Sequence, residues 1–151
     1  MRIPARIRWW PISLLAACAA FAQPALVPDP LLPNVLLIGD SVSLDYTSHV
    51  RSLLRGKANI LRPVDSKTGQ PINCGSTQEG LRGIEEWLAL TRWDVIHFNW
   101  GLWDLCYRNP ESKLYGHRDK IKGRISVPLA QYREHLETLV RRLEKTGEER
   151  G

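Results

Sequence analysis

A glycine, an acid and a serine follow directly after an apolar run near the start of the chain. Residues 34–38 read Asn-Val-Leu-Leu-Ile, and Gly39, Asp40 and Ser41 come next. An apolar run of this length, bounded by Pro33 and Gly39, predicts a buried strand of a parallel sheet. Ligands of such sheets bind beyond the carboxyl ends of the strands, so Ser41 stands where a nucleophile would act. The alternative is that Asp40 and Ser41 only make the turn and cap the following helix.

Strands and helices are predicted to alternate after this point. A capping box, Ser76-Thr77-Gln78-Glu79, marks the start of one helix, and Pro128 suits the first turn of another. Residues 105–127 have no period and predict a long loop. The predicted strands are 34–39, 58–62 and 93–100, and the predicted helices are 43–55, 76–88 and 128–147. This order predicts an α/β fold, a parallel sheet with helices on both faces.

The first 22 residues have the three parts of a secretory signal. Three arginines precede an apolar stretch over residues 9–20, and Ala20-Phe21-Ala22 suits a cleavage site. We therefore expect a secreted or periplasmic protein. Leu15-Ala16-Ala17-Cys18 also resembles a lipobox, so the alternative is a lipoprotein anchored through Cys18. Residues 23–33, rich in proline, predict an extended linker that packs little, and residues 34–151 predict one domain.

The charge of the mature chain argues against nucleic-acid binding. The formal net charge is +5, and removal of residues 1–22 takes away three arginines and no acids, which leaves +2. No segment beyond the signal is long and apolar enough to predict a membrane span. Two cysteines remain, Cys74 and Cys106, and in an oxidising compartment they either pair or stay free.

Three blocks of the sequence, taken together, resemble the SGNH hydrolases, also called GDSL lipases or acylhydrolases. Gly39 to Ser43 resembles the first block, and Asn73 to Thr77 resembles the second. The stretch from Trp93 to Asp104 resembles the third strand and the G-x-N-D block that follows it. The resemblance implies a flavodoxin-like three-layer α/β/α fold with strands in the order 2-1-3 and the last strands missing from this chain. It implies no metal and no cofactor.

The resemblance also implies roles for individual residues. Ser41 would attack an ester carbonyl, and the backbone N–H groups of Ser41 and Gly75 would bind the oxyanion. The asparagine of G-x-N-D would be the third donor, but Trp103 stands at that position. The indole N–H of Trp103 or the amide of Asn99 could replace it, since strand alternation would put residues 99, 101 and 103 on one side, although either residue could instead be structural. Asp40 and Asp104 would support these loops.

The acid–base pair of the family is a D-x-x-H block near the C-terminus, and we identify no D-x-x-H block in this chain. His117 is the histidine that we single out as a stand-in, because it lies in the loop beside the predicted site. We expect a serine ester hydrolase that acts on small acyl or carbohydrate esters. The alternative is a catalytically inactive remnant or a binding module of the same fold. A third interpretation is an anion-binding helix N-terminus after Ser41.

Overall fold

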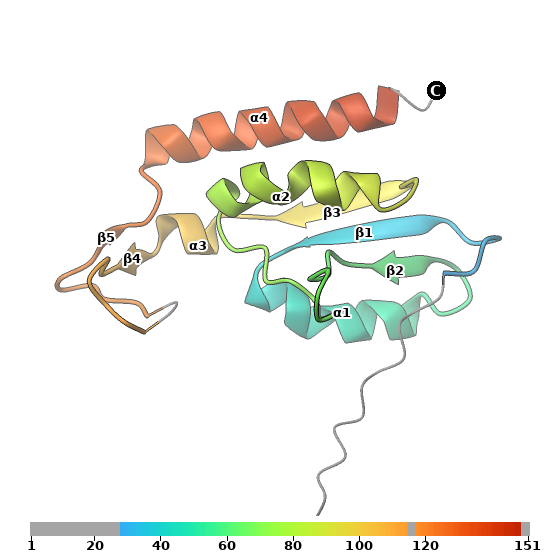
Figure 1. The fold of residues 1–151 in the computed structure, drawn as a ribbon, viewed down its shortest axis with the longest axis horizontal. Coiled ribbons are helices and arrows are strands. Elements are labelled where there is room, and N and C mark those ends of the chain that lie inside the picture. The colour runs from blue at the N-terminus through green and yellow to red at the C-terminus, as the bar shows by residue number, and fades with distance from the viewer. Residues whose placement is uncertain (1–27, 115–116, 149–151) are drawn as a thin grey trace, which may run out of the picture.

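The computed structural model describes residues 28–114 and 117–148, and it shows a mixed α/β fold (Figure 1). Within these residues a three-stranded parallel sheet is accompanied by four helices and a small two-stranded sheet. The expected signal segment, residues 1–22, and the alternative anchor Cys18 lie outside the described residues.

The central strand of the parallel sheet is β1 (Asn34–Gly39), and its side chains are buried from Leu36 onward. It pairs with β2 (Asn59–Leu61) on one side and with β3 (Val95–Asn99) on the other, both in parallel. The predicted order β2-β1-β3 is therefore confirmed. Gly39 is opposite Asn99 in the ladder, so the carboxyl ends of β1 and β3 lie side by side.

Helices cover the sheet from both sides, as the sequence predicts (Figure 1). Alternation along β3 shows the two faces: the ring of His97 contacts Tyr46 of α1 (Ser41–Leu53), whereas Phe98 packs against the core cluster that includes side chains of α2 (Thr77–Ala89). The last helix, α4 (Leu129–Glu148), packs on α2. Leu36 and Ile38 of β1 lie in this core with apolar side chains of both helices, namely Ile84, Trp87, Leu88 and Leu139.

Local sequence signals explain where α1 and α2 begin. The carboxylate of Asp40, the N-cap of α1, accepts a hydrogen bond of 3.0 Å from the N–H of Val42. The capping box of Ser76 and Glu79 is present at the start of α2. α1 begins two residues earlier than predicted, so that Ser41 is itself the first helical residue.

The described part of the proline-rich linker, residues 28–33, is mostly exposed, and the side chain of Asn59 is hydrogen-bonded to the main chain of Asp29 and Leu32. Two predictions about irregular segments are wrong. Residues 105–127 are not all loop, because β4 (Tyr107–Arg108) and β5 (Arg124–Ile125) form an antiparallel pair there. Strand alternation does not continue past β3, because Gly101 turns the chain, with φ of 142°, into α3 (Leu102–Leu105).

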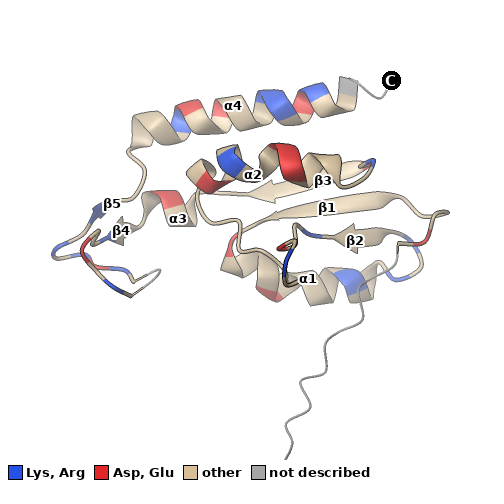
Figure 2. Cartoon of the chain, viewed as in Figure 1, with Lys and Arg blue, Asp and Glu red and all other residues tan. Residues whose placement is uncertain are grey.

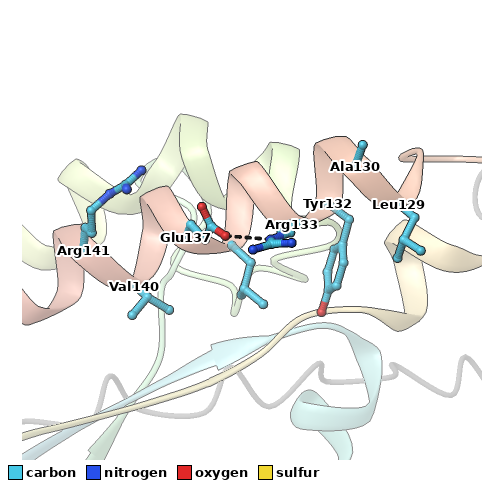
Figure 3. Close-up of a pocket in the computed structure, with 8 residues that line it drawn as sticks. Leu129, Ala130, Tyr132, Arg133, Glu137, Val140 and Arg141 are labelled. Carbon is cyan, nitrogen blue, oxygen red and sulfur yellow. Dashed lines mark hydrogen bonds and ion pairs between the residues drawn. The ribbon is translucent and has the colours of Figure 1, made fainter.

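An apolar groove of about 910 Å³ runs along α4 (Figure 3). Arg133 and Glu137 form an ion pair of 2.8 Å beside it, and charges of both signs are interspersed along α4 (Figure 2). The groove is lined by Leu129, Ala130, Tyr132, Arg133, Leu136, Glu137, Val140 and Arg141. None of the predicted site residues lines this groove, so it does not belong to the candidate site.

Candidate active site

Ser41 is exposed at the carboxyl edge of the sheet, at the first position of α1. The turn before it is buried, since Asp40 is 2% exposed. Among the described residues, neither the hydroxyl nor the backbone N–H of Ser41 has a hydrogen-bond partner. The N-terminus of a helix favours negative charge, so this free N–H is suited to bind an anionic oxygen.

The loop that contains Gly75 lies against the same turn. The N–H of Cys74 donates to the carbonyl of Gly39 over 3.0 Å, which ties the loop to the end of β1. Ser41 and Gly75 are therefore on the same edge of the sheet, as the sequence predicts. The N–H of Gly75, however, donates to Oδ1 of Asn73 over 3.0 Å, and it must leave this acceptor before it can bind an oxyanion.

Asn99, one of the two candidates for the third oxyanion donor, lies next to the Gly39–Ser41 turn, because β3 pairs with β1 at this position. It is opposite Gly39, and alternation from His97 places its side chain on the α1 face of the sheet. Among the described residues its amide has no hydrogen-bond partner, and the residue is partly exposed. The amide is thus available as a donor on the face where Ser41 begins α1.

Trp103 lies instead on α3 and is covered by a cation. The guanidinium carbon of Arg108 lies 4.0 Å from the centroid of the Trp103 ring. The expectation that residues 99, 101 and 103 share one side of a strand is wrong, because the strand ends before Gly101. Trp103 contributes a stacked ring to the loop beside the site.

Asp104 joins α3 to the start of α2. It is fully buried, and its Oδ1 accepts hydrogen bonds from the N–H of Thr77 over 2.8 Å and from the hydroxyl of Thr77 over 2.5 Å. The same hydroxyl lies 3.1 Å from Nδ1 of His135 on α4. A chain of the buried Asp104 carboxyl and Thr77 hydroxyl and the partly buried His135 imidazole therefore connects α3, α2 and α4.

No histidine of the described residues contacts Ser41. His117 is exposed in the loop between β4 and β5, and no interaction joins it to Ser41. The chain does contain one D-x-x-H spacing, Asp94 to His97, which the sequence interpretation passed over. Asp94 binds the N–H of Asn34 at the opposite end of β1, so this pair does not have the family's placement.

Arg62 is the residue of this region that the sequence interpretation missed. It follows β2 and is 4% exposed. Its guanidinium donates hydrogen bonds to the carbonyl of Gly39 and to the hydroxyl of Ser43 in the first turn of α1. Burial lowers the pKa of its guanidinium. The sequence did offer one signal: Arg62 stands between Leu61 and Pro63, directly after a short apolar strand. A guanidinium at such a position must either extend to solvent or be buried with hydrogen-bond acceptors.

The cysteines are not paired. Cys74 and Cys106 are both free thiols, so the disulfide alternative is not formed. Cys74 is buried, and burial raises the pKa of its thiol, which keeps it protonated at neutral pH. Cys106 is partly exposed.

We predict that Gly75→Ala weakens both the fold and the site. Gly75 has φ of +51°, and an added Cβ would lie 3.0 Å from a carboxylate oxygen of Glu79. The left-handed backbone costs about 1–2 kcal/mol with a side chain. Gly56→Ala is the matched control, because Gly56 has φ of +72° and open space around it. Urea unfolding should show a larger loss for Gly75→Ala, and an equal loss would contradict the crowding at Glu79.

Comparisons with known proteins do not identify a family. No protein-family model matches the chain, and no curated protein or solved structure shows significant similarity to it. Within the described residues no group of three or more His, Cys, Asp or Glu side chains is placed to hold a metal ion. None of the helices described combines the length and apolar character that crossing a bilayer requires.

Proposed function

We propose that this chain provides the nucleophile and the oxyanion hole of a serine ester hydrolase of the SGNH type. The observation that carries the proposal is an exposed serine with a free backbone N–H at the first position of a helix, beside the Cys74–Gly75 loop. The three sequence blocks that resemble the family support it, and so does the parallel order β2-β1-β3. The flavodoxin-like SGNH fold is part of the same proposal.

In the proposed reaction, the Ser41 hydroxyl oxygen attacks the carbonyl carbon of an ester. The carbonyl electron pair moves to oxygen, and the oxyanion accepts hydrogen bonds from the N–H of Ser41 and the amide of Asn99. The N–H of Gly75 joins them after it leaves Asn73. The proton of the Ser41 hydroxyl passes to solvent water, and as the ester C–O bond breaks the leaving alkoxide takes a proton from water and departs as the alcohol. A second water then attacks the acyl carbonyl, which releases the carboxylic acid and restores the Ser41 hydroxyl.

The proposed substrate is a small acyl ester, including acylated carbohydrates. The segment of residues 105–127, which contains β4 and β5, is rich in polar and charged side chains, which favours a polar alcohol over a long lipid. The chemistry requires no metal or cofactor. A secreted or periplasmic location is proposed from the signal-like residues 1–22, with a Cys18 anchor as its alternative.

A second candidate function is a binding module of the same fold that performs no hydrolysis. It is favoured by one observation: no histidine of the described residues is in contact with Ser41, so nothing there accepts its proton. In this case the free N–H of Ser41 and the amide of Asn99 would bind an ester or carboxylate without chemistry.

Mass spectrometry after incubation with a p-nitrophenyl ester of a short acid tests the proposal. We expect the full 151-residue chain to carry an acyl group on Ser41, slowly formed and absent in Ser41→Ala. Cys106 is a competing nucleophile, and its thioester is distinguished by neutral hydroxylamine, which removes it faster than an oxygen ester. Acylation confined to Cys106 or to lysines would favour the binding module.

A further inference from the structure

Arg62 is a buried cation that forms no ion pair in the described part of the chain, although the buried carboxylate of Asp40 offsets part of the lowering of its pKa from a longer distance. Only 4% of the residue is exposed, and in the described part of the chain no carboxylate lies within ion-pair distance of its side chain. Its Nε has no hydrogen-bond partner there. Burying a guanidinium in this way is costly, so its four hydrogen bonds must offset the lost hydration.

The four acceptors belong to three separate segments around the candidate site. Nη1 donates to the hydroxyls of Ser43, over 2.8 Å, and Thr47, over 3.2 Å, in the first turns of α1. Nη2 donates to the carbonyls of Gly39, over 3.0 Å, and Ile72, over 3.3 Å. Arg62 therefore connects the end of β1, the start of α1 and the loop that leads from Ile72 to Gly75.

The carbonyl of Gly39 is the point where these connections meet. It accepts from Nη2 of Arg62 and from the N–H of Cys74, each over 3.0 Å. Ser41 is two residues after this carbonyl, and Gly75 is one residue after that N–H. The spacing between the two oxyanion donors therefore depends on a carbonyl that Arg62 holds in place.

We infer that Arg62 is a positioning residue for the hydrolase site, which sets the Gly39–Ser43 turn against the Ile72–Gly75 loop; this inference rests on the proposed function. Arginine is required because its planar fork directs several N–H groups at fixed angles. A lysine carries the charge but presents one nitrogen, which cannot reach four acceptors in three segments.

Hydrogen exchange at the Cys74 amide tests the positioning without any activity. In Arg62→Lys and Arg62→Met we expect this amide to exchange at least about tenfold faster than in the wild type, because the loop separates from Gly39. Arg51→Met is the matched control: Arg51 is also desolvated, but its Nε donates to the carbonyl of Ile60, away from the Gly75 loop. It should lower stability and leave Cys74 exchange unchanged.

The rate constant for acylation of Ser41 by the p-nitrophenyl ester tests the effect on the site. We expect about a 10²-fold fall in Arg62→Met, since a displacement of about 1 Å costs that much, with little change in the ester concentration that gives half the maximal rate. Guanidinium ion at a concentration well below denaturation should partly restore the rate in Arg62→Met and should not affect Arg51→Met. Unfolding alone would not lower the rate constant while leaving the half-saturating ester concentration unchanged, and guanidinium ion would not reverse it.

The outcomes separate the inference from the proposed function. If folded Arg62→Lys keeps wild-type exchange at Cys74, the positioning role is overturned, whatever the chain hydrolyses. If the exchange rises but the wild type acylates no more than Ser41→Ala, the proposed function fails and the positioning of the loop stands. Should both Arg62 variants fail to fold, Thr47→Val, which removes one acceptor from α1, must accelerate Cys74 exchange or the inference is wrong.

Discussion

Hydrolysis of a short activated acyl ester by the 151-residue chain is expected to be slow and to disappear in Ser41→Ala. A serine hydroxyl is a poor nucleophile while nothing takes its proton, and no histidine of the described residues contacts Ser41. Loss of triad members costs serine enzymes about 10⁴–10⁶ in rate, and the oxyanion hole supplies most of what remains. Spectrophotometric release of p-nitrophenol measures this residual rate.

Three variants serve as controls for the serine assay. Ser48→Ala changes another exposed serine of α1 and should leave the rate unchanged. His117→Ala and His135→Ala should also leave it unchanged, because neither side chain contacts Ser41 in the described structure. Brisk turnover by the wild type that is lost in both Ser41→Ala and His117→Ala would identify His117 as the base and contradict the expected slow rate.

Replacing Asp104 by alanine is expected to lower the free energy of unfolding by about 3 kcal/mol. The change leaves the N–H of Thr77 without its acceptor in a fully buried place and leaves the Thr77 hydroxyl with Nδ1 of His135 as its partner; a buried unsatisfied group costs about 1–3 kcal/mol. Such a loss is a large share of the stability of a small domain. Urea denaturation followed by circular dichroism measures it.

Two comparisons sharpen this stability test. Asp104→Asn keeps one oxygen acceptor and should lose less than Asp104→Ala. Asp65→Ala removes a carboxylate that also accepts hydrogen bonds from Lys67 and Thr68, but in an exposed loop, so its effect should be much smaller. Equal losses for Asp65→Ala and Asp104→Ala would mean that burial of the Asp104 network contributes nothing.

Local signals in the sequence determined the strands of the parallel sheet and the starts of α2 and α4, but not β4, β5 or α3. The apolar run before Gly39 predicts β1 with its observed bounds, because four uninterrupted apolar residues, 35–38, between Pro33 and Gly39 are typical of a strand covered on both faces. The capping box at Ser76 predicts the start of α2, since its hydrogen bonds join residues three apart. These interactions are short in sequence, and so the sequence alone can show them. The placement of Ser41 and Gly75 at one edge follows from the parallel order.

Only the tertiary structure decided which polar groups surround the site, because these contacts join residues far apart in the chain. Arg62 reaches Gly39 across 23 residues, and Asp104 reaches Thr77 across 27. The sequence also did not show that Trp103 lies on α3 and not on an extension of the strand. A single glycine in a positive-φ conformation, Gly101, changes the direction of the chain there without altering the apolar pattern. Arg62 and Asp104 form these contacts because both are buried, and a polar group removed from water needs a hydrogen-bond partner within the fold.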